Sequence, residues 1–145
     1  MAVDFAKLGK TKLGEIPRPP KEPAGVYHGV VRSWKWAESR WRDKETNQTE
    51  AQIHFTIKPT EAEVDLPDTI KLANLIHVAE VSVQSDAQVY YMQEFLRSLG
   101  VDIVGKDLDQ ALPETIGANV TYDVVVKDGE KGQIVNIRKL RARVA

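Results

Sequence analysis

The sequence predicts a mainly β fold in which five strands form an antiparallel sheet or barrel, with one main helix between the third and fourth strands. Several segments alternate apolar and polar residues at period two, and one segment has an apolar helical face. No regular alternation of strands and helices indicates a parallel sheet. The 145 residues, of which 42% are hydrophobic and 28% charged, match one ordinary globular domain.

The composition also excludes several classes of protein. The chain has no cysteine, so a disulfide framework, a thiolate metal site and a cysteine nucleophile are excluded, and a cytoplasmic location is expected. No apolar run has the length of a signal peptide or approaches the ~18 residues of a spanning helix. We therefore expect neither export by that route nor contact with a membrane.

Two units are predicted along the chain: a basic, Pro-rich extended arm over residues 1–24 and a folded domain over residues 25–145. The arm has little apolar material, and its prolines stand among basic residues, a composition that favours polyproline-like chain without a core. Its prolines are Pro17, Pro19, Pro20 and Pro23.

The first two strands form a predicted hairpin. VYHGVVRSWKWA predicts a strand over about 26–37, with Gly29 at a bulge or bend. The polar segment ESRWRDKETNQTE is expected to be the exposed connection. Residues 51–58 then alternate apolar and polar side chains, which is typical of a strand with one buried face.

A loop, an ambiguous segment and a helix follow. Pro59 and Pro67 bracket an acidic loop, and TIKLANLIHVAEV then satisfies neither period cleanly; we predict a strand, with a short helix as the alternative. Ser85 and Gln88 have the capping-box spacing at the start of a helix over about 86–99. The apolar face of this helix comprises Val89, Met92, Phe95, Leu96 and Leu99.

The last third of the chain predicts a second hairpin. DLDQALPETIG indicates one helical turn broken before Pro113, and alternation then predicts a fourth strand over about 118–127. Asp128 and Gly129 open a turn into the fifth strand, QIVNIRKL. This inventory is that of the five-stranded Greek-key OB-fold barrel, which binds oligonucleotides around strands two and three. A helix packed on an open antiparallel sheet is the rival architecture.

Charge is distributed unevenly along the chain, although the net charge is only −1. Residues 1–44 carry 10 basic and 5 acidic side chains, residues 45–117 carry 4 and 13, and residues 118–145 carry 6 and 3. A fold that joins the two basic ends would have one positive face, on which a polyanion could bind. Scattered solvated charge is the alternative.

The densest aromatic and basic cluster is RSWKWAESRWR, which contains all three tryptophans. Single-stranded nucleic acid requires cations for its phosphates and flat rings on which its bases can stack. In an extended strand, Arg32, Trp34 and Trp36 share one face, while Trp41 falls in the exposed connection. Burial of Trp34 and Trp36 in the core is the alternative. The predicted binding surface comprises Arg32, Trp34, Lys35, Trp36, Arg40, Trp41 and Arg42.

Signals of catalysis are weak. The three histidines, at 28, 54 and 77, lack metal-site spacing, and no phosphate-binding glycine loop or nucleophile elbow occurs. We expect a solvated loop, not a two-metal nuclease site, from the acidic run after Pro59. Tyr90 and Tyr91 are expected to complete the core or its rim. The basic run after Ile137 is either a phosphate track or a solvated end. Because the catalytic signals are weak, we predict a protein without enzymatic activity, cofactor or metal.

Several stretches resemble a known family. They are PAGVYHGVV, the following hairpin, the helix end FLRSLGV, and LPETIGANVTYDVVVKDGEKGQIVNIRKL. Together, over about 23–140, they resemble the small OB-fold single-stranded DNA-binding proteins of bacteriophage replication and recombination modules. The resemblance implies an OB barrel, binding of single-stranded DNA without strong sequence preference, and a role alongside a polymerase, helicase or recombinase. Many such proteins end in an acidic tail, whereas this sequence ends RKLRARVA.

The sequence therefore predicts a single-stranded DNA-binding protein that acts in phage DNA replication or recombination, in the cytoplasm of a bacterial host. RNA binding is a close variant, because no residue is assigned to reading a 2′-hydroxyl. The alternative is a protein-interaction or virion-associated module that uses the Trp and Arg patch as a hot spot. Replication or recombination proteins are the expected partners, and no particular oligomeric state is predicted.

Overall fold

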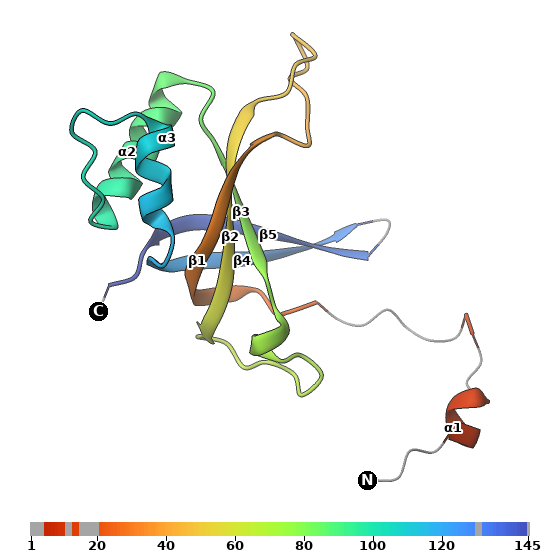
Figure 1. Ribbon diagram of the computed structural model, residues 1–145. Helices are drawn as coiled ribbons and strands as arrows, with labels where there is room; N and C mark the ends of the chain where they lie inside the picture. The colour runs from red at the N-terminus through yellow and green to blue at the C-terminus, as the bar shows by residue number, and fades with distance from the viewer. Residues whose placement is uncertain (1–4, 11–12, 15–20, 130–131, 145) are drawn as a thin grey trace.

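The computed structural model describes residues 5–10, 13–14, 21–129 and 132–144 and shows a mainly β protein built on a five-stranded antiparallel sheet (Figure 1). The order across the sheet is β3-β2-β1-β4-β5. The main helix, α2, comes between the third and fourth strands, which confirms the predicted order of elements. The strands are β1 (Gly25–Glu38), β2 (Ala51–Ala62), β3 (His77–Ser82), β4 (Asn119–Gly129) and β5 (Gly132–Ala142).

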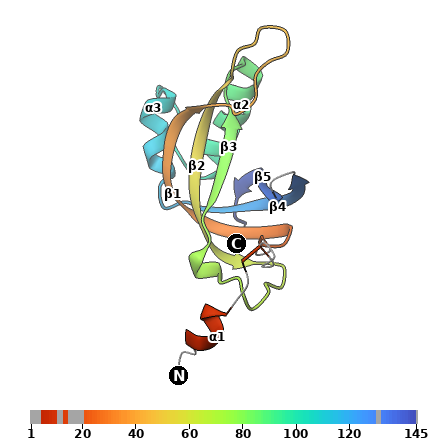
Figure 2. The ribbon, with the colours of Figure 1, turned by 90° about the vertical axis from the view of Figure 1, so that its right-hand side faces the viewer.

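β3 and β5 are the two edges of the sheet. Within the described ranges no ladder of hydrogen bonds joins them, so the barrel expected from the sequence is not closed by backbone pairing. The reason lies in β1: β4 pairs only with its first part, residues 25–30, whereas β2 pairs with most of its length. The β4–β5 hairpin therefore turns away and runs across β1–β3 (Figures 1 and 2).

A β-bulge lies beside Gly29, near the position that the sequence predicts, but its extra residue is Thr60 of β2. The pairing with β2 shifts between His28 and Gly29. A Cβ at Gly29 would lie 2.7 Å from Ile57 Cγ2 and 2.7 Å from the carbonyl oxygen of Lys58. Only glycine allows the two backbones to approach this closely.

The end of β2 and the start of β3 differ from the prediction. Pro59 does not begin a loop. It remains in β2, paired with Gly29 and next to the bulge at Thr60, where a residue without an N–H is tolerated, and β2 ends at Ala62. Only the end of TIKLANLIHVAEV forms a strand. Its start contains the 3-10 helix η1 (Leu72–Asn74), because Leu72 and Leu75 turn toward the core instead of alternating.

The predicted main helix is confirmed as α2 (Asp86–Ser98), with its capping box. The Gln88 N–H donates to Ser85 Oγ (3.2 Å), and the Ser85 N–H donates to Gln88 Oε1 (3.0 Å). Met92 and Leu96 are buried, and Gly100 has the left-handed φ of +85° expected after a helix. The chain then forms the short helices α3 (Leu108–Ala111) and η2 (Leu112–Thr115).

The second hairpin also forms as predicted, with its turn residues 130–131 outside the described residues. Val120, Tyr122 and Val124 alternate into the core. β5 extends to Ala142, beyond the predicted end at Leu140. Most of the basic C-terminal run is therefore part of a strand.

A chain of hydrogen bonds lies within the core. His77 Nε2 is 2.8 Å from Glu22 Oε1, and His77 Nδ1 is 2.7 Å from the Tyr122 hydroxyl. Because a carboxylate only accepts, Nε2–H donates to Glu22, which leaves Nδ1 to accept from Tyr122. Burial lowers the pKa of His77 against the opposing effect of Glu22, and burial raises the pKa of Tyr122. The network is satisfied with neutral His77 and protonated Tyr122.

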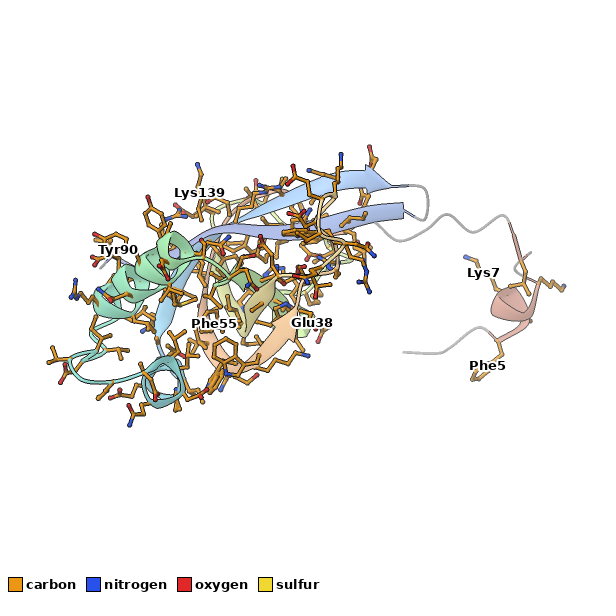
Figure 3. All side chains as sticks on the ribbon, turned by 90° about the horizontal axis from the view of Figure 1, so that it is seen from above. Phe5, Lys7, Glu38, Phe55, Tyr90 and Lys139 are labelled. Atoms are coloured by element: carbon orange, nitrogen blue, oxygen red, sulfur yellow. The ribbon has the colours of Figure 1, made fainter. Side chains whose placement is uncertain are left out.

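The predicted arm is described in part. Residues Phe5–Gly9 form α1, which lies apart from the sheet (Figure 3), so this stretch is helical and not extended. Its Ala, Lys and Leu residues are good helix formers. Lys21 and Glu22 contact the folded domain: the Lys21 N–H donates to Gln133 Oε1 (3.1 Å), and Glu22 is buried. Pro17, Pro19 and Pro20 lie outside the described residues.

Deleting residues 1–20 is expected to leave the free energy of unfolding nearly unchanged, whereas deleting residues 1–22 should lower it by about 1–3 kcal/mol. The longer deletion removes the Glu22 carboxylate and leaves a buried donor on His77 without its acceptor. Urea denaturation of both deletion variants measures the difference. Equal stabilities would contradict this role of Glu22.

Candidate functional site

A wide depression follows the open seam between β3 and β5. One hollow, of about 1050 Å³, is lined by β3, β5, α2 and residues 40–41. A second hollow, of about 430 Å³, is lined by β3, β5, residues 21–22 and Ile76, which lies between η1 and β3. The two hollows share lining residues and form one groove, here named the seam groove. The shared residues are Arg40, Val78, Glu80, Ile134, Val135 and Ile137.

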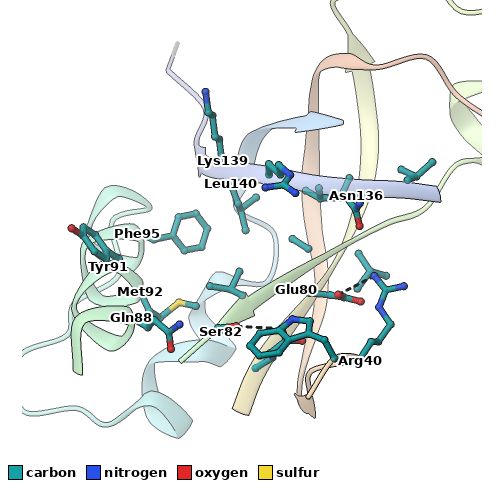
Figure 4. A pocket seen from close by; sticks show the side chains of 18 of the residues that line it. Arg40, Glu80, Ser82, Gln88, Tyr91, Met92, Phe95, Asn136, Lys139 and Leu140 are labelled. Atoms are coloured by element: carbon teal, nitrogen blue, oxygen red, sulfur yellow. Dashed lines mark hydrogen bonds and ion pairs between the residues drawn. The ribbon is translucent and has the colours of Figure 1, made fainter. Parts of the chain in front are cut away.

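Two exposed aromatic side chains line the larger hollow. Trp41 is 49% exposed and Tyr91 is 70% exposed. Phe95, one helical turn after Tyr91, is half-buried and packs edge-to-face on Phe55, with ring centroids 5.8 Å apart. Figure 4 shows Tyr91 and Phe95 of α2 on one side of the hollow. The hollow thus offers flat apolar surfaces from two separate elements.

Cations come to the same hollow from both basic ends of the chain. Arg40 follows β1, while Arg138 and Lys139 lie in β5 and are exposed. Arg40 Nη2 is 3.1 Å from Glu80 Oε2. Among the described residues, neither Arg138 nor Lys139 forms an ion pair with its side chain. Arg141 and Arg143, in contrast, pair with Asp123 (3.3 Å) and Glu61 (2.5 Å).

A second bulge, in β5, places Lys139 beside the hollow. Its φ is +54°, unusual for a residue with a side chain, and the pairing with β4 shifts between Thr121 and Asp123. The Lys139 carbonyl oxygen accepts from Arg141 Nη1 (2.7 Å). Bulges re-aim side chains next to binding sites. Figure 4 shows Lys139 at the β5 side of the hollow.

Hydrogen bonds hold Trp41 in a folded loop. The buried Ser39 hydroxyl donates to the Trp41 carbonyl oxygen (2.7 Å) and accepts from the Glu50 N–H (2.8 Å). Further along, Asp43 Oδ1 accepts from the N–H groups of Glu45 (2.8 Å) and Thr46 (3.1 Å), and these bonds lower the pKa of Asp43. These bonds fix the backbone of the loop that carries the Trp41 side chain.

Trp34 and Trp36 do not line this hollow. The pairing of β1 with β2 shifts between Val31 and Ser33, which leaves Arg32 in a bulge. Beyond it, Trp34 pairs opposite the core residue Phe55, and paired residues share a face of the sheet. Trp34 packs half-buried against the core. Its position lies between the two predictions for Trp34, a binding surface and a core residue.

Trp36 is 45% exposed, but it contacts another element. Its indole Nε1–H donates to Asp109 Oδ1 of α3 (2.8 Å). Lys35 pairs opposite His54, which pairs opposite Glu80, so Lys35 lies on the other face of β1. Burial lowers the pKa of His54.

Of the seven predicted residues, the structure brings two into the seam groove, Arg40 and Trp41. Arg42 points back into its own loop, where it donates to the Asn47 carbonyl oxygen (3.1 Å). Tyr91, Arg138 and Lys139 were not among the predicted site residues. Tyr91 was expected to complete the core or its rim; it does not complete the core, because Met92 and Leu96 already fill the buried face of α2. The basic run was the one available signal for Arg138 and Lys139.

No protein-family model matches the chain, and the search of the curated proteins finds no match either. In the described ranges, no three His, Asp or Glu side chains are placed together to hold a metal ion. Across the same residues, none of the helices combines the length and apolarity needed to cross a membrane.

Proposed function

We propose that this protein binds single-stranded nucleic acid, with single-stranded DNA as the expected ligand, along the seam groove. The observation that carries the proposal is the meeting of two exposed rings, Trp41 and Tyr91, with Arg40, Arg138 and Lys139 in one hollow. Stacking platforms beside phosphate-binding cations are the common requirements of sequence-tolerant binding to single strands.

We further propose that the architecture is an OB-type barrel. Support comes from the order β3-β2-β1-β4-β5, the helix between β3 and β4, and a seam left open between β3 and β5. OB folds are partly open five-stranded barrels that bind oligonucleotides near strands two and three and adjoining loops. A role in bacteriophage DNA replication or recombination rests on the sequence resemblance.

Replacing Trp41 with alanine is expected to weaken binding to oligo-dT by about 1–3 kcal/mol, because a stacking surface is lost. Fluorescence anisotropy of a labelled oligo-dT measures the affinity, and a thermal melt should show little change in stability. Trp36→Ala is the matched control: Trp36 is similarly exposed but bonds to Asp109, so its loss should leave the affinity unchanged. Equal losses in both variants would move the binding face away from the groove.

A protein-interaction module is the second candidate, and the smaller hollow favours it. Ile76, Val78 and Ile134 are exposed apolar side chains at this end of the groove. Exposed apolar patches are typical of protein interfaces.

Two binding experiments separate the candidates. Retention on immobilised single-stranded DNA that weakens steeply with salt supports nucleic-acid binding, because phosphate contacts release counterions. Equal affinity for oligo-dT and a hairpin duplex of matched length would contradict base stacking.

A further inference from the structure

Glu80 is the acidic side chain in the middle of the seam groove. It lines both hollows, and it lies on β3 opposite His54. A carboxylate here opposes a polyanion either by direct repulsion or by occupying a cation that phosphate would use. Its position therefore bears on how tightly a nucleic acid binds.

The cation that Glu80 engages is Arg40. Arg40 Nη2 lies 3.1 Å from Glu80 Oε2, and Figure 4 shows the pair beside β3, at the edge of the hollow. Within the described residues, Glu80 has no other ion-pair partner. The Arg40 side chain is 66% exposed against 28% for Glu80, so the arginine is the more solvated member of the pair.

Such an exposed pair is weak enough to exchange. Ion pairs at the surface contribute little net free energy, because solvent screens them and two side chains must be held in place. A guanidinium binds phosphate at least as well as carboxylate, through paired N–H donors. Phosphate binding gains in addition from counterion release along the nucleic acid.

We infer that Glu80 is a positioning residue that holds Arg40 beside β3 in the free protein and must release it before Arg40 can bind a phosphate. This inference rests on the proposed function. Glu80 thereby lowers the affinity for single strands and keeps the groove occupied when no ligand is present. The groove changes from an internal ion pair to a phosphate contact without movement of the strands.

The test is a double-mutant cycle with Glu80→Gln and Arg40→Ala, measured by anisotropy with labelled oligo-dT. The amide keeps the shape of the side chain and removes its charge, so E80Q alone should tighten binding by about two- to fivefold. In the R40A background the same change should have little effect, because the residue that Glu80 restrains is gone. R40A should also lower the slope of log K against log salt by about 0.7.

Glu114→Gln is the matched control, since Glu114 forms an exposed ion pair with Lys106 (2.9 Å) outside the groove. It should leave the affinity unchanged, and the melting temperature of E80Q should equal that of the wild type. Tightening by E80Q that persists in R40A would show simple repulsion and overturn the inference. If the wild type binds and E80Q behaves like E114Q, the inference fails while the proposed function stands. Absence of binding by the wild type overturns both.

Discussion

Replacing His77 with alanine is expected to lower the free energy of unfolding by about 3–5 kcal/mol. The imidazole is buried and bonds at both nitrogens, to Glu22 and to the Tyr122 hydroxyl. Its removal leaves a cavity and two polar groups without partners, at a cost of about 1–3 kcal/mol for each group that stays buried. Urea denaturation at pH 7.5 measures the change.

Tyr122→Phe is the control, because it removes a single hydroxyl and keeps the ring. It should cost about 1–2 kcal/mol, the value of one hydrogen bond with the His77 acceptor left unpaired. A His77→Ala variant as stable as Tyr122→Phe would show that Glu22 and the cavity contribute nothing.

The same variant should change the dependence of stability on pH. Burial lowers the pKa of His77 from its usual 6.5, so the unfolded chain takes up this proton at higher pH than the folded protein. The stabilisation is complete above about pH 6.5 and is lost as the pH falls through the folded-state pKa. The free energy of unfolding should therefore fall less steeply with acid in the His77→Ala variant than in the wild type. Parallel curves would contradict this assignment.

Phe55→Ala is expected to lower the free energy of unfolding by a similar amount, about 3–5 kcal/mol. Phe55 is fully buried, lies between Trp34 and Ala79 in the pairing of three strands, and packs edge-to-face on Phe95 of α2. Its loss removes contacts on which the sheet and the helix both depend.

Phe5→Ala is the matched control, because the ring of Phe5 is exposed on α1. That substitution should change the stability by less than about 0.5 kcal/mol, as is usual for exposed positions. Denaturation curves of the two variants, measured side by side, test the difference. Similar midpoints for both would show that Phe55 does not hold α2 on the sheet.

The elements of this protein follow from local sequence patterns. The alternation over residues 51–58 predicts β2, and the spacing of Ser85 and Gln88 predicts the start of α2. Gly29 marks a bulge because a side chain has no room there. In each case the determining residues lie within a few positions of one another, so periodicity and capping chemistry suffice.

The candidate site does not follow from such patterns. The sequence places three tryptophans in one short cluster, but in the structure only Trp41 lines the groove, while Trp34 packs against the core and Trp36 bonds to Asp109. The β1–β4 and β4–β5 pairings instead bring Arg138 and Lys139 to the groove that Trp41 and Tyr91 line.

The amino-acid sequence by itself determined the mainly β class, the order of strands and helix, and the presence of stacking rings and cations in the chain. The tertiary structure alone decided that the sheet stays open between β3 and β5, and which rings and cations line the opening. The physical reason is that a shift of one residue in strand register turns each side chain to the opposite face. Bulges such as those at Arg32 and Lys139 produce that shift, and their positions depend on packing between segments distant in sequence.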